Sequence, residues 1–275
     1  MKIKRNVPLN RMAYIGIGGS AETVFFPENR DEAAELILKF GRGLNIVGGC
    51  SNCIFEDGTH TRPFLSTVFL KKLRYGAFIE AECGLPSQAL NAFARKKGLR
   101  GFTALTGIPG TLGGALNGNA TASSDSIFDI LTKAEVIGLD GKVRSLTHFS
   151  PGYRTGNIEG FIYSAMFRIV QCDRSSLDTM IKDILRKRRT QPGGRTCGSV
   201  FKNPPGDHAG RLIEVCGLKG RKSGGLEISR EHANFFVNKA RARFTDFIEL
   251  LDTARNTVKE KFGIELEPEV KIIRR

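Results

Sequence analysis

The stretch that decides the fold is NIVGGCSN, Asn45 to Asn52, in which a short apolar run leads directly into two glycines and three small side chains. A second glycine-rich stretch, TGIPGTLGGALNGNA, runs from Thr106 to Ala120. Glycine lets a backbone approach a diphosphate closely and aim successive N–H groups at it. Neither stretch has Rossmann or Walker A spacing. Each could also be an ordinary turn, since the chain holds 32 glycines.

The segments around these stretches alternate between strand and helix patterns. Apolar runs predict short strands at 23–26, 44–47 and 77–83. Apolar residues at helical spacing predict helices within 29–40, 85–97, 175–189 and 245–262, with Asn29 and Thr245 as the caps of the first and the last. Asp140-Gly141 predicts the tight turn of a hairpin. The pattern indicates an α+β protein, and a polar segment at 173–176 predicts a domain boundary there.

Composition limits the class of protein. The chain has 275 residues, 40% of them hydrophobic and 25% charged, which is typical of one large or two modest globular domains. It has no run of 18 apolar residues and no apolar signal segment after its basic start, so we expect no membrane span and a cytoplasmic location. Six scattered cysteines indicate reduced thiols.

Cys50 and Cys53 form a C-x-x-C pair, but no second pair follows at the spacing of a structural zinc site. We therefore predict no metal site, while a redox role of the pair remains a minor alternative.

The net charge of +14 has two interpretations. A basic protein can bind nucleic acid, or it can attract anionic small molecules such as nucleotides. The densest run, Arg186 to Pro192, follows a helical pattern, and basic residues in a last helical turn complement the helix dipole. Tryptophan is absent and no aromatic residues are interleaved with the charges, so nucleic-acid binding is the weaker interpretation.

Ser199 lies in CGSVFKNP, Cys197 to Pro204. The stretch lacks the G-x-S-x-G elbow of serine hydrolases. If Ser199 takes part in chemistry, that chemistry is not acyl transfer.

Taken in order, a series of motifs resembles the MurB-type UDP-N-acetylenolpyruvoylglucosamine reductases over nearly the whole chain. They are PLNRMAYIGIGGSAE, VGGCSN, GLRGFTALTGIPGTLGGA, GYR at 152–154, RRTQP at 188–192 with CGSVFKNP at 197–204, HANFFVN at 232–238 and LEPEV at 266–270. The chain looks like the shorter family type, without an inserted tyrosine loop. The resemblance implies an FAD-binding fold of the vanillyl-alcohol-oxidase kind over residues 1–172, in two αβ subdomains that meet near 65–70. It also implies an α+β substrate-binding domain over 173–275.

The resemblance further implies a reaction. NADPH reduces bound FAD, and the enolpyruvyl ether of UDP-N-acetylglucosamine is then reduced to UDP-N-acetylmuramate, a step of peptidoglycan precursor synthesis. By motif, the catalytic residues would be Ser199 as proton donor, Arg154 on the substrate carboxylate and Glu269 on the enol. The expected substrate contacts are Lys202 and Asn203, whereas His232 would be structural. The expected cofactor contacts are Gly48, Gly49, Cys50, Ser51, Asn52, Gly107, Ile108, Gly110, Thr111, Gly113, Gly114 and Asn119.

The chain departs from the family pattern after the second glycine stretch. The family continues toward Asn-Ala-Gly-Ala-Tyr-Gly, whereas here Thr121, Ser123 and Ser124 replace glycine, tyrosine and glycine. Threonine lacks the backbone freedom that glycine has at positive φ, so this departure affects the expected local flavin contacts.

Two alternatives remain open at this point. One is a flavin-dependent oxidase or dehydrogenase of the same fold that acts on another substrate, and the other is a basic nucleic-acid-binding protein. The sequence leaves the oligomeric state open.

Overall fold

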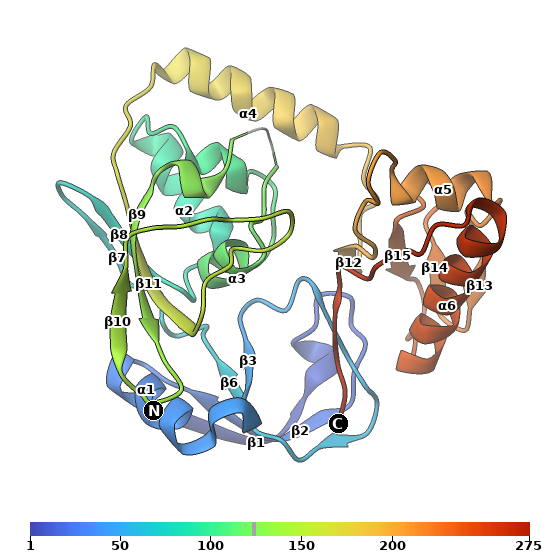
Figure 1. Cartoon of the computed structure of the whole chain (residues 1–275), viewed down its shortest axis with the longest axis horizontal. Helices are drawn as coiled ribbons and strands as arrows, with labels where there is room; N and C mark the ends of the chain where they lie inside the picture. The colour runs from blue at the N-terminus through green and yellow to red at the C-terminus, as the bar shows by residue number, and fades with distance from the viewer. Residues whose placement is uncertain (123–124) are drawn as a thin grey trace. The chain divides into compact units, whose positions relative to one another are not determined.

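The computed structural model describes residues 1–122 and 125–275. Its α-helices are α1 (Arg30–Phe40), α2 (Ser87–Lys96), α3 (Leu112–Asn117), α4 (Arg174–Arg188), α5 (Ala209–Val215) and α6 (Phe244–Phe262), as drawn in Figure 1. Short 3-10 turns are η1 (Leu9–Arg11), η2 (Gly41–Gly43), η3 (Phe102–Leu105) and η4 (Ile127–Asp129).

The strands of the N-terminal half are β1 (Lys2–Pro8), β2 (Ser20–Phe26), β3 (Asn45–Val47), β4 (Cys53–Phe55), β5 (Thr59–His60), β6 (Phe64–Ser66), β7 (Leu73–Tyr75), β8 (Ile79–Glu82), β9 (Leu131–Ile137) and β10 (Val143–Leu146). Those that follow are β11 (Phe161–Phe167), β12 (Thr196–Ser199), β13 (Lys222–Ser223), β14 (Leu226–Ile228), β15 (Phe235–Asn238) and β16 (Lys271–Ile273).

Packing divides the chain into two compact units. The first, called unit 1, holds 1–5, 23–49 and 62–188, and unit 2 holds 6–22, 50–61 and 189–275. The chain passes from unit 1 to unit 2 between Gly49 and Cys50, inside the first glycine stretch. The domain boundary expected at 172 stays a prediction.

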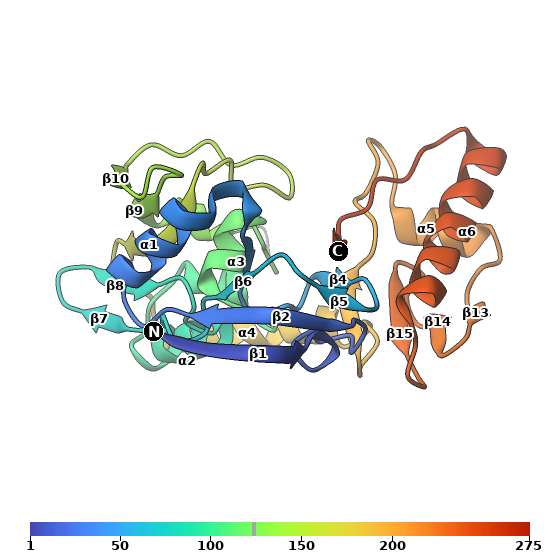
Figure 2. The same cartoon turned by 90° about the horizontal axis from the view of Figure 1, so that it is seen from below.

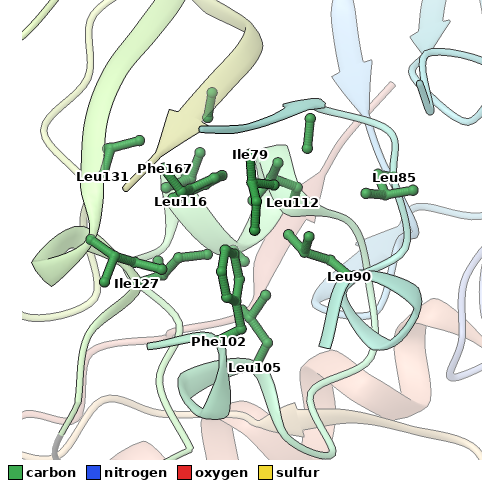
Figure 3. Packing of buried hydrophobic residues seen from close by; sticks show 14 of the residues in the cluster. Ile79, Leu85, Leu90, Phe102, Leu105, Leu112, Leu116, Ile127, Leu131 and Phe167 are labelled. Carbon is green, nitrogen blue, oxygen red and sulfur yellow. The ribbon is translucent and has the colours of Figure 1, made fainter. Parts of the chain in front are cut away.

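The main sheet of unit 1 is antiparallel, with strand order β10-β9-β11-β8-β7. Hydrophobic clusters cover both of its faces. In the larger cluster, side chains from β8, α2, η3 and α3 meet one another, as Figure 3 shows for Ile79, Leu90, Phe102 and Leu112. Because η3 and α3 are both anchored in this cluster, the glycine stretch between them starts and ends at fixed points.

The smaller cluster of unit 1 packs α1 against the other face of the sheet. Asn29 caps α1 as expected, since its side chain accepts the backbone N–H of Glu32 at 2.9 Å. A parallel ladder joins β2, β6 and β3 and delivers the chain to the first glycine stretch. The expected hairpin joins β9 to β10, with Gly141 at φ 72°.

Unit 2 contains an antiparallel sheet of order β12-β15-β14-β13. Helix α6 packs along β13 and β14 and also contacts α5, as Figure 2 shows. The expected cap of α6 is wrong by two residues: Arg243 is the N-cap, and its N–H donates to Asp246 at 2.8 Å, while Thr245 lies inside the helix. Strand β16 pairs in parallel with β4 and brings Lys271 beside Cys53.

The dense basic run lies where the helical pattern predicts. Arg186, Lys187 and Arg188 form the last turn of α4. The same helix contacts α2, and Arg95 pairs with Asp178 at 2.8 Å. Among the described residues, none of the helices is both long enough and apolar enough to span a membrane.

Candidate active site

The two glycine stretches meet within unit 1. A side chain on Gly49 would place its Cβ 2.8 Å from the Cα of Gly110, and one on Gly48 would collide with the hydroxyl of Thr111. Only glycine permits so close an approach of two backbones. Gly110 also adopts φ 115°, a conformation that favours glycine. The structure therefore brings together two loops that lie far apart in the sequence.

The donor set of these loops suits an anion. The parts of these loops that lie in unit 1, 48–49 and 106–114, contain backbone amides and hydroxyls but no carboxylate. A diphosphate needs hydrogen-bond donors without competing negative charge. The amides of Ile108 and Gly113 are already used inside unit 1, where they donate to Leu105 at 3.1 Å and to Cys83 at 2.7 Å.

Cys50 occupies a left-handed position in unit 2, with φ 49°. Its thiol is buried and interacts with that of Cys53; this hydrogen bond, together with burial, raises the pKa of Cys50 well above its usual value. A thiol with so high a pKa is neutral and unreactive at neutral pH. Cys50 is thus held as a small buried group.

Ser199 lies at the end of β12, opposite Phe235 of β15. The pairing shifts register between Thr196 and Ser199, and Gly198 takes φ 76° within this irregularity. Irregularities of this kind re-aim the side chains of a strand. Ser199 is accordingly half-buried at the edge of the sheet rather than packed into its core.

Glu269 lies beside the end of β12 in unit 2. Its backbone N–H donates to the carbonyl of Val200 at 2.8 Å, one residue after Ser199. Asn52 adds a hydrogen bond from its side-chain amide to the Glu269 carbonyl at 3.2 Å. The charge of Glu269 also contributes to the pKa of Cys197, which burial chiefly raises to about 12. The structure therefore brings together Ser199 and Glu269, two residues 70 positions apart.

Arg154 belongs to unit 1 and lies outside regular strands. Its backbone is left-handed, with φ 60°, inside a narrow turn closed by the Gly152–Thr155 bridge. Its guanidinium lies 5.4 Å from the ring centroid of Tyr153. The side chain of Asn119 holds this turn by donating to the carbonyl of Gly152 at 2.9 Å. Asn119, an expected cofactor contact, thus supports the turn that carries the expected carboxylate-binding arginine.

The two expected substrate contacts already have partners within unit 2. The ammonium of Lys202 pairs with Glu267 at 2.6 Å. The side chain of Asn203 accepts the N–H of Ala209 at 3.1 Å, at the start of α5. A substrate phosphate would have to share the ammonium of Lys202 with Glu267 or replace Glu267 there.

Known proteins identify the family. One family model, described as UDP-N-acetylenolpyruvoylglucosamine reductase, C-terminal domain, matches 190–273, and another, described as FAD binding domain, matches 21–147. The UDP-N-acetylenolpyruvoylglucosamine reductase 2 of Bacillus cereus is 36% identical over 98% of this chain and 92% of its own length. The corresponding reductase of Geobacillus kaustophilus is 33% identical over 98% of this chain and 93% of its own. The chain belongs to this reductase family.

A solved structure agrees with this family assignment. The UDP-N-acetylenolpyruvylglucosamine reductase of Thermus caldophilus superposes with a TM-score of 0.87 and 28% identity, over 99% of both chains. The expected fold class is confirmed: an FAD-binding domain of mixed helices and strands, with the C-terminal domain of the reductase family. The joined glycine loops, free of carboxylates, fit the diphosphate of FAD.

The departure from the family pattern has a local explanation. Among the described residues of this segment, the left-handed one is Asn119, with φ 43°, rather than Thr121. Asparagine tolerates that conformation. The hydroxyl of Thr121 instead donates to the carbonyl of Asp125 at 2.7 Å. The substitutions at 123 and 124 lie outside the described residues.

Sequence reasoning missed one residue beside the second loop. A Cβ on Gly107 would lie 2.8 Å from Nε of Arg188, so the guanidinium packs directly on that glycine. Burial lowers the pKa of Arg188 but leaves the group cationic at neutral pH. The RRTQP motif was the available signal, but a residue 81 positions from Gly107 gave no indication of this contact.

Proposed function

We propose that this chain reduces the enolpyruvyl ether of UDP-N-acetylglucosamine to the lactyl ether of UDP-N-acetylmuramate, with NADPH as reductant. This would be a step of peptidoglycan precursor synthesis in the cytoplasm. The observation that supports it most is the backbone hydrogen bond of Glu269 to Val200, directly after Ser199.

Bound FAD, once reduced by NADPH, would supply the hydride needed at the enolpyruvyl double bond. The residues that would hold it are those of the two glycine loops, Gly48–Asn52 and Gly107–Gly114, with Asn119 beside them. Their backbone amides and small side chains would bind the diphosphate. Arg188 would add a positive charge next to Gly107.

Ser199 would complete the reduction by giving its hydroxyl proton to the substrate. Hydride addition leaves an electron pair on the carbon that carries the carboxylate. A centre so basic takes a proton from a hydroxyl without a histidine partner, and water returns the proton to the serine. Hydride and proton together make up the two-electron reduction.

Arg154 and Glu269 would manage the charge of that intermediate. A guanidinium matches the two oxygens of a carboxylate, so Arg154 would hold the substrate carboxylate as electron density moves onto it. Glu269 would hydrogen-bond the enol form. Lys202 and Asn203 would contact the substrate, with Lys202 binding the UDP phosphates.

The test of this function starts from the purified protein with its released cofactor identified. We expect FAD, consumption of NADPH only when UDP-N-acetylglucosamine enolpyruvate is present, and a product two hydrogens heavier. Protein that refuses added FAD and instead binds RNA with steep salt dependence would favour the nucleic-acid alternative. A flavin that NADPH and this substrate leave unchanged, but that another substrate reduces, would favour an oxidase or dehydrogenase.

A further inference from the structure

The side chain of Asn234 forms hydrogen bonds with the backbone of Phe201, two residues after the proposed proton donor Ser199. Asn234 is buried, with 3% of its surface exposed, just before β15. Its Oδ1 accepts the N–H of Phe201 at 2.9 Å, and its Nδ2 donates to the carbonyl of the same residue at 2.8 Å. Its own carbonyl accepts the N–H of Val200 at 2.8 Å. Three hydrogen bonds thus fix the two residues that follow Ser199.

The opposite side of this backbone is held by the segment that carries Glu269. The carbonyl of Val200 accepts the N–H of Glu269, and the N–H of Val200 donates to the carbonyl of Asn234. The segment 200–201 is therefore clamped between Asn234 and Glu269. The clamp needs a neutral side chain with both a donor and an acceptor, such as this amide, because only such a group can satisfy the N–H and the carbonyl of Phe201 together.

We infer that Asn234 is a positioning residue for the proton donor, an inference that rests on the proposed role of Ser199. Fixing the backbone at 200–201 fixes the direction in which the Ser199 hydroxyl points relative to Glu269. A displacement of about 1 Å in a reacting group can cost about 100-fold in rate. Asn234 would therefore contribute to the rate without touching the substrate.

The chain offers a matched control in Asn238, at the end of β15. It too is buried, donating to the carbonyl of Ile15 at 2.9 Å and accepting the N–H of Ala242 at 3.0 Å. Its side chain makes the same kind of double contact, but not with the residues that follow Ser199. Damage to the fold alone should be similar at both asparagines, whereas damage to Ser199 should follow only from Asn234.

The test replaces Asn234 by aspartate, which has the same shape. An ionised carboxylate can accept from Phe201 but cannot donate to it, whereas the protonated acid can do both. Burial and this donor requirement raise the pKa of the introduced acid. Flavin reoxidation by the enolpyruvyl substrate should therefore be slow at high pH, by about 100-fold, and recover as pH falls.

The measurement is stopped-flow flavin absorbance from about pH 5 to about pH 9, a range that covers the raised pKa of buried carboxyls. The ionisable groups His232, Lys202 and Glu269 also face this segment, but wild type and Asn238→Asp contain them too. Flavin reduction by NADPH should stay near normal in Asn234→Asp at every pH. Asn234→Ala loses both contacts and should be slow without recovery.

The outcomes separate this inference from the proposed function. The inference is overturned if Asn234→Asp reoxidises like wild type at high pH while Ser199→Ala is slow. It is also overturned if Asn238→Asp shows the same pH-dependent loss, because the effect would then be one of folding. If Ser199→Ala itself reoxidises normally, the proton-donor role fails first. If Asn234→Asp unfolds above neutral pH, its reoxidation rate is compared only at acidic pH. A rate that rises as pH falls there still supports the inference, and a constant rate overturns it.

Discussion

The segments that carry Ser199 and Arg154 are held in different ways. Ser199 ends a strand, and the backbone after it is bonded on one side to Asn234 and on the other to Glu269. Arg154 lies in a turn with a left-handed backbone, supported by Asn119 through one hydrogen bond to Gly152. A proton donor must be aimed within tenths of an ångström, whereas a charge–charge contact tolerates more movement. We expect changes near Ser199 to affect rate and changes near Arg154 to affect affinity.

The largest effect should follow Ser199→Ala. Removal of a general acid typically costs about 100- to 10,000-fold. The variant should bind FAD and be reduced by NADPH at a near-normal rate, and then reoxidise very slowly with substrate. Ser199→Cys keeps a proton on a softer, larger atom, so its reoxidation rate should fall between those of wild type and Ser199→Ala. Stopped-flow flavin absorbance separates the half-reactions; wild-type-like reoxidation in Ser199→Ala would show that another group supplies the proton.

The next effect should follow Arg154→Lys, which keeps the cation but loses the planar two-pronged contact. Loss of one charge-assisted hydrogen bond should weaken use of the enolpyruvyl substrate by about tenfold to a hundredfold. Much of this loss should appear in KM, and flavin reduction by NADPH should remain normal. Arg144→Lys is the control, since Arg144 pairs with Asp140 at 2.6 Å in the exposed hairpin. If both half-reactions fall together in Arg154→Lys, Arg154 is structural.

A smaller effect should come from Asn119, the support of the Arg154 turn. Asn119→Gly keeps the left-handed backbone and loses two side-chain bonds, the one from the Ser126 hydroxyl and the one to Gly152. The bond to Gly152 is worth about 1 kcal/mol, or about fivefold in KM. Asn119→Ala loses the same bonds and also strains the backbone, so it should unfold more easily by about 1 kcal/mol. Substrate titration measures the change in KM, and urea unfolding measures the change in the free energy of unfolding. Unchanged KM in both variants would show that the turn needs no help from Asn119.

Much of the fold could be predicted because local patterns carried it. The cap at Asn29, the spacing within α2 and the turn at Gly141 each depend on neighbours within a few residues. The motif order likewise indicated the family. The error at Thr245 arose because a threonine beside a possible helix start resembles a cap, whereas the backbone N–H of Arg243 donates to Asp246 and the cap lies two residues earlier.

The supports of the site could not be predicted, because they join residues distant in the sequence. Asn234 bonds to Phe201, and Arg188 packs on Gly107, although 33 and 81 positions separate them. No periodicity encodes such pairs. The sequence also assigned Asn52 and Asn119 to the cofactor by motif alone, whereas their side chains bond to Glu269 and Gly152 in the structure. That they also contact FAD remains a prediction.

The smallest expected effect concerns His232, which contacts Asn234 and so supports the segment that carries Ser199. Its Nδ1 accepts the N–H of Asn234 at 3.3 Å, and burial lowers the pKa of this histidine. As pH falls, the unfolded chain, with a histidine pKa near 6.5, therefore binds a proton at a higher pH than the folded protein does. The stabilising contribution is complete above that value and is lost as pH falls through the lowered folded pKa.

The variant His232→Asn isolates this contribution, because asparagine offers an oxygen acceptor near Nδ1 but does not titrate. Urea unfolding from about pH 8 to about pH 5 should show wild type losing more stability than the variant. The other histidines and the carboxylates are common to both proteins and cancel in the difference. Equal pH slopes would mean that His232 titrates alike in the folded and unfolded chains. In that case the hydrogen bond to Asn234 would not depend on a neutral imidazole, and the support of the Ser199 segment would begin at Asn234 itself.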